Sequence, residues 1–588
     1  MEPQKPVDPS QVKLEKSPSS GDSCSGSGGL KGLICKALCV LFVIGNVTAL
    51  YVLHFVNRPS PTTRFTFSNF AATANTSPKK GDVVSLSTAS TLRNGAGTTA
   101  YLNSLQLSGA DYFEYLNLAP MGTTKSSYAT NLVGYARTTG TTFESVVTTF
   151  TVDATTKAIT PAVVATGNII KNEYLRGIAT LSDTVAVAFS IEPFTSATYS
   201  TYITPVTLDG ATATLMPAQR VKATDFSSAN FIAALPGMSA LVVAYYEPYA
   251  TTSYSQRVKV AMVDPSTKAV SFSADTPWFG VDNTPTSMTQ FGKPAAVGTT
   301  GAFIIPYYTT NATAPSGLCV TKSTFSAAAK SVAVFSTPVC NTKFAPTNLI
   351  ESIMLSDSVL ALAFVDKGNN NALTVATVAV SSYDGTLRFR SSYVVTEASG
   401  AFEFGKGYSF SPKPSMAKLA GSRLVLSFLN PAMAGKLSDV TPVLPLAKPD
   451  FSLIAETPAT SKTVTLDALP VSDDGVVTGY LGFRGATVHQ RFSVVEDFGT
   501  PVGVLREYTN KKKKASVAIS GKAKVSGGLT VGQVYYATTT GKVVKALISA
   551  SLSPATYVYS DDGSRLMTAN SKVGIAVEND QLFVNTAL

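Results

Sequence analysis

The chain has 588 residues, of which 45% are hydrophobic and 14% charged, and its formal net charge is +10. Disordered chains combine low hydrophobicity with high charge, so this composition argues against general disorder. It also argues against a coiled coil, which would be rich in Glu and Lys. The length allows several domains.

An uncharged apolar segment, Ala37 to Val56, is long enough to span the hydrocarbon core of a bilayer as a helix. We therefore predict a disordered cytoplasmic tail (1–32), a transmembrane signal anchor (33–57) and a polar stem (58–82). A cleaved signal peptide is the alternative. Against it, the preceding segment is long and no small-residue cleavage site follows.

Positive charge flanks both ends of this segment, so the charge bias alone orients it weakly. Asn75 and Asn311 begin N-glycosylation sequons. Cys319 and Cys340 lie on either side of a small-residue turn, where a hairpin would bring them within disulfide reach. A disulfide suits an oxidising compartment, whereas two buried free thiols are the alternative. These features predict a type II, single-pass protein of a cell membrane or endomembrane, with its C-terminal part extracellular or lumenal.

Beyond the stem, short stretches of alternating apolar and polar residues are separated by Gly, Pro, Asp and Ser, which predicts strands and turns. A small turn followed by a strand with an aromatic residue recurs every 52 to 64 residues. The aromatic markers are Tyr135, Phe189, Tyr245, Tyr307, Phe364, Phe428 and Tyr480.

A second marker, a tight turn between two strands, keeps the same register. These turns fall near Asp153, Asp209, Asp264, Ser326, Asp384, Lys448 and Asp497. Each unit thus contains about four strands, which can be buried by stacking the units around an axis. The repeat resembles a seven-bladed β-propeller over residues 83–506, without WD dipeptides or kelch double glycines. Six or eight blades, and an array of β-sandwiches, are the alternatives.

The composition changes after residue 506, and residues 507–588 form the last predicted region, a basic linker and a small β domain. Lys511, Lys512, Lys513 and Lys514 begin a basic patch that could attract an acidic polymer. A solvated linker is the alternative, and we expect no nucleic acid because aromatic RNA-binding motifs are missing. The text GLTVGQVYY and VGIA resembles small β modules of viral tail and surface proteins. The predicted fold class is therefore all-β: a transmembrane helix, about seven four-stranded blades and a small β domain.

Few residues point to catalysis. The chain has two histidines, and only His489 lies beyond the apolar segment, in a strand pattern. It carries no phosphate-binding loop, HExxH or EF-hand motif, so we expect no metal and no cofactor. The fragments around Asp384 and Asp474 partly resemble the Asp box of sialidases, but both also fit ordinary Asp-Gly turns.

The loops between the second and third strands of each unit are expected on one face. They carry aromatic and charged residues that suit a glycan or a protein surface. The candidate binding residues are Glu192, Phe194, Glu247, Tyr249, Tyr307, Tyr308, Lys367 and Arg484.

The leading hypothesis is a membrane-anchored extracellular propeller for recognition, adhesion or surface assembly that binds glycan or protein without catalysis. The alternatives are a propeller glycoside hydrolase or sialidase-like enzyme, and a viral-type surface attachment glycoprotein. Three or more carboxylates and arginines around the propeller axis would favour an enzyme, whereas an apolar or Ser/Thr-lined axis would argue against one.

Overall fold

The computed structural model describes residues between 64 and 585, with internal gaps that include 278–287, 395–414, 428–442 and 457–465. The chain divides into two compact units, residues 1–61 and 62–588, and every described residue belongs to the second. Among the described residues, no helix is long and apolar enough to cross a membrane. The predicted tail and anchor lie outside the described residues.

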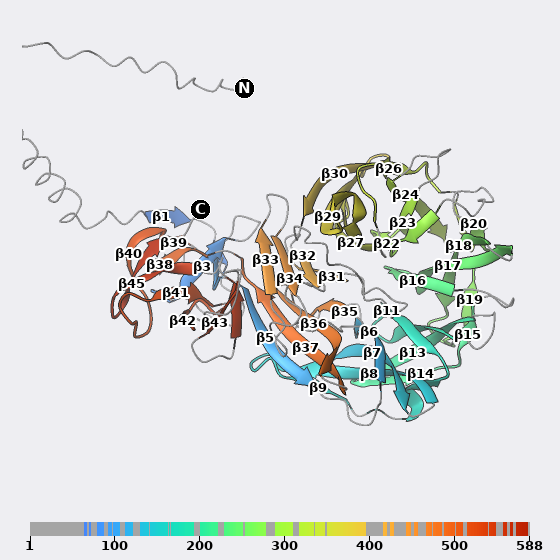
Figure 1. The fold of residues 1–588 in the computed structure, drawn as a ribbon, viewed down its shortest axis with the longest axis horizontal. Coiled ribbons are helices and arrows are strands. Elements are labelled where there is room, and N and C mark those ends of the chain that lie inside the picture. The colour runs from blue at the N-terminus through green and yellow to red at the C-terminus, as the bar shows by residue number, and fades with distance from the viewer. Residues whose placement is uncertain are drawn as a thin grey trace, which may run out of the picture. The chain divides into compact units, whose positions relative to one another are not determined.

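The described part is all-β, and its sheets follow one another along the chain (Figure 1). We number the four-stranded sheets as blades and give their strands from the innermost outward. Blade 1 consists of β6 (Tyr112–Pro120), β7 (Asn131–Thr139), β8 (Thr142–Val152) and a split outer strand, β9 (Ile159–Pro161) with β10 (Ile169–Lys171). Blade 2 consists of β11 (Tyr174–Ser182), β12 (Val185–Ile191), β13 (Thr201–Asp209) and β14 (Thr212–Leu215) with β15 (Gln219–Arg220).

The next three blades repeat this order. Blade 3 consists of β16 (Ser228–Leu235), β17 (Ala240–Ala250), β18 (Ser253–Val263) and β19 (Val270–Phe272) with β20 (Thr276–Pro277). Blade 4 consists of β21 (Met288–Phe291) with β22 (Ala295–Val297), β23 (Ala302–Thr309), β24 (Gly317–Ser326) and β25 (Ser331–Val332) with β26 (Val339–Asn341). Blade 5 consists of β27 (Glu351–Ser356), β28 (Val359–Asp366), β29 (Ala372–Val380) and β30 (Leu387–Val394).

The last two blades depart from the simple order. In blade 6, β31 (Ser415–Lys418) and β32 (Leu424–Ser427) are followed by β34 (Ser452–Glu456), which pairs with β32 in parallel, and then by β33 (Val443–Ala447). In blade 7, β35 (Leu466–Pro470), β36 (Gly475–Arg484) and β37 (Thr487–Asp497) are completed by β5 (Thr98–Leu105), from before blade 1.

The first strands of neighbouring blades contact one another around a closed ring, which Figure 1 shows surrounding a common centre. The contacting pairs are β6–β11, β11–β16, β16–β22, β22–β27, β27–β31, β31–β35 and β35–β6. A ring of seven four-stranded sheets with one strand supplied from the other end of the chain is a β-propeller. The predicted propeller is thus confirmed at the level of the architecture.

The repeat markers locate the blades correctly. The aromatic markers lie on the second strands of blades 1 to 5 and 7, whereas Phe428 lies outside the described residues. Those of blades 1 to 5 are at most 3% exposed, because each fills the interface with a neighbouring blade. The turn markers of blades 1 to 5 follow the third strand, as predicted, and Lys448 lies outside the described residues.

The strand pairing corrects both ends of the predicted propeller. β3 (Val83–Leu86) and β38 (Pro501–Thr509) pair with each other in a different sheet. The blades themselves extend from Thr98 to Asp497. The strand after Asp497 does not enter blade 7, because β5 already occupies the free edge of β37.

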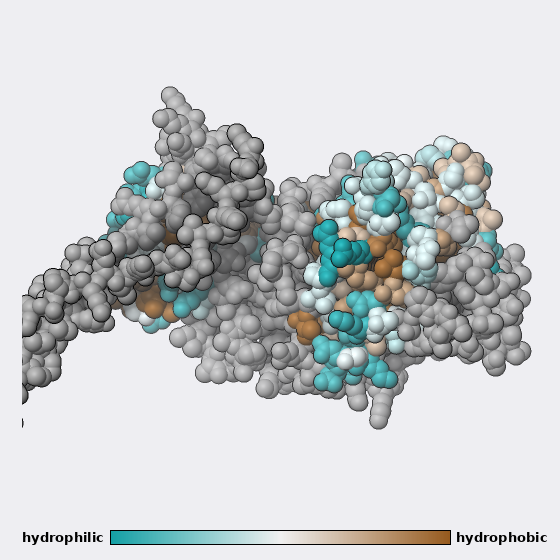
Figure 2. All heavy atoms as spheres, turned by 90° about the horizontal axis from the view of Figure 1, so that it is seen from above, coloured by the Kyte–Doolittle hydropathy of each residue, from teal (hydrophilic) through white to brown (hydrophobic). Residues whose placement is uncertain are grey.

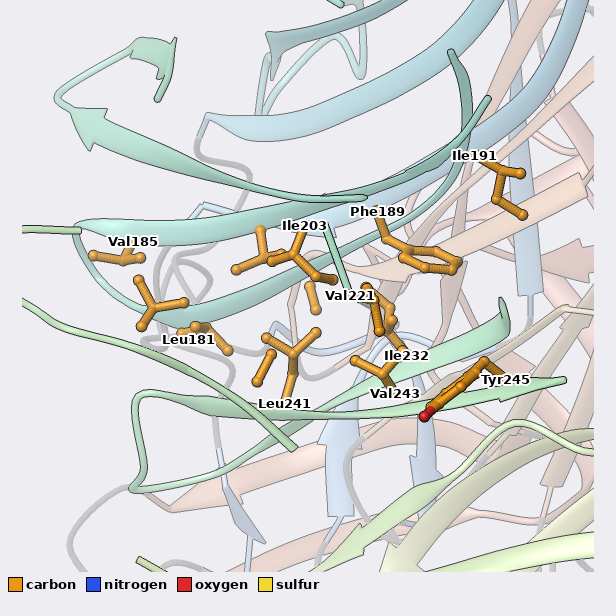
Figure 3. Close-up of a cluster of buried hydrophobic side chains, with 14 residues drawn as sticks. Leu181, Val185, Phe189, Ile191, Ile203, Val221, Ile232, Leu241, Val243 and Tyr245 are labelled. Carbon is orange, nitrogen blue, oxygen red and sulfur yellow. The ribbon is translucent and has the colours of Figure 1, made fainter. Parts of the chain in front are cut away.

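The blades are held together by apolar side chains in the sheet–sheet interfaces. Figure 3 shows the interface of blades 2 and 3, where Phe189 and Ile203 of one sheet face Leu241 and Val243 of the other. These four side chains are fully buried. Alternation along each strand sends every second side chain into one interface and the rest into the other, so both faces of a blade are apolar.

The C-terminal region folds together with residues that precede the propeller. One sheet has the strand order β1 (Arg64–Phe67), β39 (Lys514–Ala518), β38, β3, β4 (Leu92–Asn94) and β2 (Phe70–Ala71). The predicted stem therefore contains strands: RFTF alternates aromatic and polar residues, and it pairs with β39.

The remaining C-terminal strands extend the blade 7 sheet beyond β5. They are β40 (Ser520–Lys524), β41 (Val534–Ala537), β42 (Val543–Leu547), β43 (Tyr557–Ser560), β44 (Arg565–Thr568), β45 (Lys572–Glu578) and β46 (Gln581–Asn585). On the part of the propeller that Figure 2 shows at the right, hydrophobic residues are bordered by hydrophilic ones.

Several turns between third and fourth strands place a residue in the left-handed region. Lys268 of blade 3 has φ 61°, and its N–H donates to the Asp264 carbonyl at 2.9 Å. Gly385 holds the same position in blade 5, with φ 70°. Glycine adopts this conformation without strain.

We expect Lys268→Gly to raise the free energy of unfolding by about 0.5 kcal/mol. It removes a left-handed penalty of about 1–2 kcal/mol, part of which is offset by the larger unfolded-state entropy of glycine, about 0.4–1 kcal/mol. Urea unfolding measures the change. Lys343→Gly is the control, because Lys343 also lies between two strands but has no positive φ; it should lower stability, and an equal gain in both variants would contradict the explanation.

Candidate functional site

The candidate site lies at one end of the blades, which we call the top face. There the first strands begin, the second strands end and the third strands begin, because consecutive strands of a blade are antiparallel. Side chains from several blades therefore converge on this face, close to the ring axis. The turns that contain Asp264 and Asp384 lie at the opposite end.

Asp467 joins three first strands near the axis. Its Oδ2 accepts a hydrogen bond from the Leu118 N–H of β6 at 2.6 Å. Its Oδ1 accepts from the Ser415 hydroxyl of β31 at 2.7 Å and from the Ala468 N–H at 2.8 Å. The carboxylate thus ties blades 6, 7 and 1 together, and its oxygens are engaged in structural bonds.

A buried ion pair joins blades 4 and 5 at the same level. Lys293 Nζ lies 2.7 Å from Glu351 Oε1, and the Glu351 side chain is 1% exposed. Burial alone would lower the pKa of Lys293, but the charges of Glu351 and Asp467 outweigh it, so its pKa is raised and the lysine stays protonated. The first strands of the described residues therefore bring charged groups to the axis, which is neither apolar nor lined by Ser and Thr alone.

Blade 2 carries a second polar group of residues on the top face. Glu173 directly precedes β11 and accepts a hydrogen bond from the Ser190 hydroxyl of β12. Glu192, just after β12, accepts from the Tyr202 hydroxyl of β13 at 2.8 Å. Arg220 of β15 donates to the hydroxyl of Ser200. We call Glu173, Ser190, Glu192, Ser200, Tyr202 and Arg220 the blade 2 cluster.

The two carboxylates of the blade 2 cluster influence each other. Burial raises the pKa of Glu173, the hydrogen bond from Ser190 opposes the rise, and the charge of Glu192 adds to it. Burial, the hydrogen bond to Glu192 and the charge of Glu192 also raise the pKa of Tyr202, so its hydroxyl stays protonated. Tyr202 is thus suited to donating or accepting hydrogen bonds, not to nucleophilic attack.

We expect Glu173→Gln to increase stability at neutral pH. A raised folded-state pKa means that ionisation costs stability as the pH rises from the unfolded value of about 4.3 through the folded value. Glutamine removes this cost and can still accept the Ser190 hydrogen bond. Urea midpoints should show a larger advantage of the variant at about pH 7 than at about pH 4, and an equal difference at both would contradict the raised pKa.

Blade 3 shows how a similar set of residues can be purely structural. The Tyr245 hydroxyl donates to Asp275, which also forms an ion pair with Lys259 at 2.9 Å. Lys259 in turn donates to the Val221 carbonyl at 3.0 Å. Burial first, and then Asp275, raises the pKa of Tyr245. Because Tyr245 is fully buried, this group links strands and is not a binding surface.

The predicted binding residues differ in where they lie and how exposed they are. Glu192 lies on the top face in the blade 2 cluster. Tyr307 is 3% exposed, so it packs between blades instead of lining a loop, while its neighbour Tyr308 is half-buried. Lys367 is exposed in a 3-10 turn after β28.

The remaining predicted binding, glycosylation and basic-patch residues lie partly or wholly outside the residues that the structure describes. Glu247, Tyr249 and Arg484 are on β17 and β36, but their side chains are not described. Those wholly outside the described residues are Phe194, Asn75, Asn311, Lys511, Lys512 and Lys513. Lys514 is the first residue of β39.

The two cysteines are bonded. Cys319 of β24 and Cys340 of β26 occupy directly opposed positions of an antiparallel pair, and their Sγ atoms form a disulfide. It fastens the split outer strand of blade 4 to the third strand.

Three lysines of the predicted basic region form ion pairs with acidic residues. Lys522, Lys524 and Lys542 lie 3.2, 2.6 and 2.8 Å from acidic oxygens of Glu578, Asp580 and Asp82. The pairs of Lys522 and Lys524 are exposed, and such pairs contribute about 0–1 kcal/mol each to stability, whereas Asp82 is buried. The three pairs reduce the positive charge left for an acidic polymer.

The aspartates of the two fragments that partly resemble an Asp box, Asp384 and Asp474, form structural contacts within the fold. Asp384 Oδ1 accepts from the Thr386 N–H and hydroxyl at 3.0 and 2.9 Å. Hydrogen bonds from Ser381 and Thr386 lower its pKa to about 2. Asp474 forms an ion pair with Arg93 of β4. Among the residues that the structure covers, no three His, Cys, Asp or Glu side chains are arranged to hold a metal ion.

No protein-family model and no curated protein matches the chain. Solved structures show a distant likeness. The NanB sialidase from Streptococcus pneumoniae, as a K499G mutant, is 8% identical, with 68% of this chain and 70% of that chain covered and a TM-score of 0.34.

Two further solved structures are similar at the same level. An α-L-arabinanase from Penicillium chrysogenum is 11% identical over 69% of this chain and 99% of that chain, with a TM-score of 0.32. A protein of unknown function from Dyadobacter fermentans is 9% identical over 68% and 99%, with a TM-score of 0.37. Because these scores are low, the propeller rests on this chain's own strand pairing and sheet contacts.

Proposed function

We propose that the chain is a recognition protein whose propeller binds a glycan at the top face without catalysing a reaction. The blade 2 cluster carries this proposal. It combines two carboxylates, a protonated tyrosine hydroxyl and a guanidinium, and Glu173, Glu192 and Tyr202 are half-buried rather than sealed off. Hydroxyl-rich ligands are recognised by such convergent donors and acceptors next to an aromatic ring.

We further propose that residues 33–57 anchor the chain in a membrane with the propeller outside the cytoplasm. The disulfide between Cys319 and Cys340 supports this placement, because disulfides persist in oxidising compartments. Adhesion or surface assembly would then follow from binding glycans on a neighbouring surface. The basic segment at Lys511 to Lys514 remains a candidate contact for an acidic polymer.

Glycoside hydrolysis is the second candidate function. Glu173 has a raised pKa and lies near a second carboxylate, Glu192. A carboxyl group with a raised pKa can act as the general acid of a glycosidase, which works with a second carboxylate. The carboxylates nearest the axis argue against it, because Asp467 and Glu351 are engaged in structural bonds.

A glycan array probed with the full chain in detergent tests the proposal, followed by assays of reducing-sugar release on every glycan that binds. Binding without release supports recognition. Release that is abolished in Glu173→Gln would establish the hydrolase instead. An array without any bound glycan would contradict both functions and leave a protein partner.

A further inference from the structure

Exposed large hydrophobic side chains gather at one place in the described part of the chain. There, Tyr383, Val531, Ile575 and Phe583 are the large hydrophobic residues that are exposed. Tyr383 lies alone in a turn of blade 5, whereas the other three lie on or next to β41, β45 and β46, near the C-terminus. Single exposed hydrophobic residues are ordinary, but a patch of them marks a site of interaction with a protein or a membrane.

The strand register places these residues in one row. Ile575 of β45 lies directly opposite Val534 of β41 on one side and Phe583 of β46 on the other. Phe583 in turn lies opposite Lys522 of β40. Directly opposed residues of antiparallel strands project from the same face of a sheet. We call the face that carries Val534, Ile575 and Phe583 the apolar face.

The other face of the same strands already has a partner within the fold. Tyr535, Ala576 and Leu582 alternate with the residues of the apolar face, are at most 5% exposed and belong to one hydrophobic cluster. That cluster also contains Val83 and Val504 of the six-stranded sheet. A sheet with one face in a core normally presents polar residues on the other. The core therefore does not account for the hydrophobic residues of the apolar face.

Lysines border the apolar face. Lys522 ends the row, and Lys572 lies directly opposite Tyr536, which alternation places on the same face as Val534. Both lysines are exposed, and none of the described ion pairs includes Lys572. A lysine can lay its methylene groups along an apolar surface while its ammonium stays at a polar level. Hydrophobic and aromatic residues with a border of lysines suit the boundary between the acyl chains and the phosphate-bearing headgroups of a bilayer.

The connectivity of the chain favours a bilayer as the occupant. β1 begins at Arg64, and the segment from Asn57 to Arg64 directly follows the apolar segment. Eight residues span at most about 29 Å when fully extended. β1 pairs with β39, which shares a hydrophobic cluster with the strands of the apolar face (Figure 1). An apolar segment inside a membrane would therefore keep these strands close to the bilayer surface.

A second copy of the chain fits the apolar face less well. Stable protein interfaces bury about 800 Å² on each partner, and a single row of side chains across four strands offers much less. A row of this size suits shallow insertion into a bilayer, because the anchor already supplies the main attachment and the face needs to add little.

We propose that the apolar face docks on the bilayer that holds the anchor, with Ile575 and Phe583 below the headgroups and the bordering lysines at the level of the phosphates. This docking rests on the proposed membrane anchoring of residues 33–57. Blade 7 and the strands of the apolar face belong to one sheet, joined where β5 pairs with β44. Docking would therefore also fix the orientation of the propeller above the membrane.

Tryptophan fluorescence of the full chain in lipid nanodiscs tests the docking. Phe583→Trp is compared in discs of ordinary lipids and of lipids brominated on the upper acyl chains, since bromine quenches tryptophan by contact. An interfacial apolar face lies about 5–10 Å below the headgroups, so the emission above the wild-type background of Trp278 should fall by about half or more. Tyr383→Trp, an exposed aromatic position on blade 5, is the matched control and should emit equally in both discs.

A second substitution shows whether the apolar face itself makes the contact. Adding Ile575→Glu to Phe583→Trp should abolish the quenching, because the carboxylate resists transfer out of water. Quenching that survives this substitution, or that is equal at positions 383 and 583, would overturn the docking. Thermal unfolding of each variant is measured in parallel, so that a folding defect is not mistaken for a lost contact.

The remaining outcomes separate docking from anchoring. A chain that stays with the discs but shows no quenching at position 583 would overturn the docking and leave the anchoring intact. A chain that does not stay with the discs would contradict the anchoring, and the docking with it. A change in the emission of Phe583→Trp only in discs that hold two copies would show that a second copy covers the face, which would also overturn the docking.

Discussion

Phe492→Ala should lower the free energy of unfolding by about 3–5 kcal/mol, the usual loss for deleting a buried phenyl ring. Phe492 of β37 stacks on Phe150 of β8, with ring centroids 5.8 Å apart, and both rings are almost completely buried. This contact joins blade 7 to blade 1, where the propeller ring closes. The cavity therefore opens in the apolar interface between blades 7 and 1.

Urea unfolding followed by circular dichroism measures this loss. Tyr383→Ala is the matched control, because its aromatic side chain is 99% exposed and should contribute almost nothing. A loss of less than about 1 kcal/mol in Phe492→Ala would show that the closing contact is not part of the core.

Asp467→Ala should also destabilise the propeller, by about 2–4 kcal/mol. It leaves the N–H groups of Leu118 and Ala468 and the Ser415 hydroxyl without their acceptor, and each unsatisfied buried group costs about 1–3 kcal/mol, not fully additively. Asp467→Asn should cost about half as much, because the amide oxygen replaces one acceptor while the amide nitrogen faces another donor.

Thermal and urea unfolding of both Asp467 variants check this order. Asp357→Asn is the control, since Asp357 is exposed in the turn between β27 and β28. If the alanine and asparagine variants were as stable as the control, Asp467 would not link the three blades. It would then be free for a role in binding or catalysis.

The blades could be predicted from the sequence because their packing leaves a periodic trace. Each blade interface requires an aromatic or large apolar residue at the same position on the second strand of the blade. This requirement is met by four buried aromatic residues, Tyr135, Phe189, Tyr245 and Phe364. The turn after the third strand repeats for the same reason, with Asp264 and Asp384 accepting hydrogen bonds from their own turns.

The closure of the ring could not be predicted in this way. β5 pairs with β37 across almost 400 residues of chain, and nothing in its own text, TTAYLNSL, distinguishes it from an inner strand. The C-terminal sheet has the same difficulty, because β1 and β3 join β39 and β38 from opposite ends of the chain. Long-range pairing leaves no local pattern.

The candidate site was predicted only in part. Glu192 was found because it follows a strand with an aromatic marker. Glu173, Tyr202 and Arg220 lie at different positions of the repeat, and in the sequence they resemble ordinary solvent-facing residues. Only the pairing of β11, β12, β13 and β15 brings them together.

The most direct test of the blade 2 cluster as the recognition site compares wild-type full chain with a Glu192→Gln/Tyr202→Phe double variant on the glycans that the array identifies. The double variant keeps the shape of both side chains but removes the negative charge and the tyrosine hydroxyl. The account predicts at least about tenfold weaker binding, the loss expected for hydrogen bonds to a charged group. Stability should fall only by about 1 kcal/mol, for the lost hydrogen bond between Tyr202 and Glu192. Wild-type affinity in the double variant would place the recognition site elsewhere on the chain.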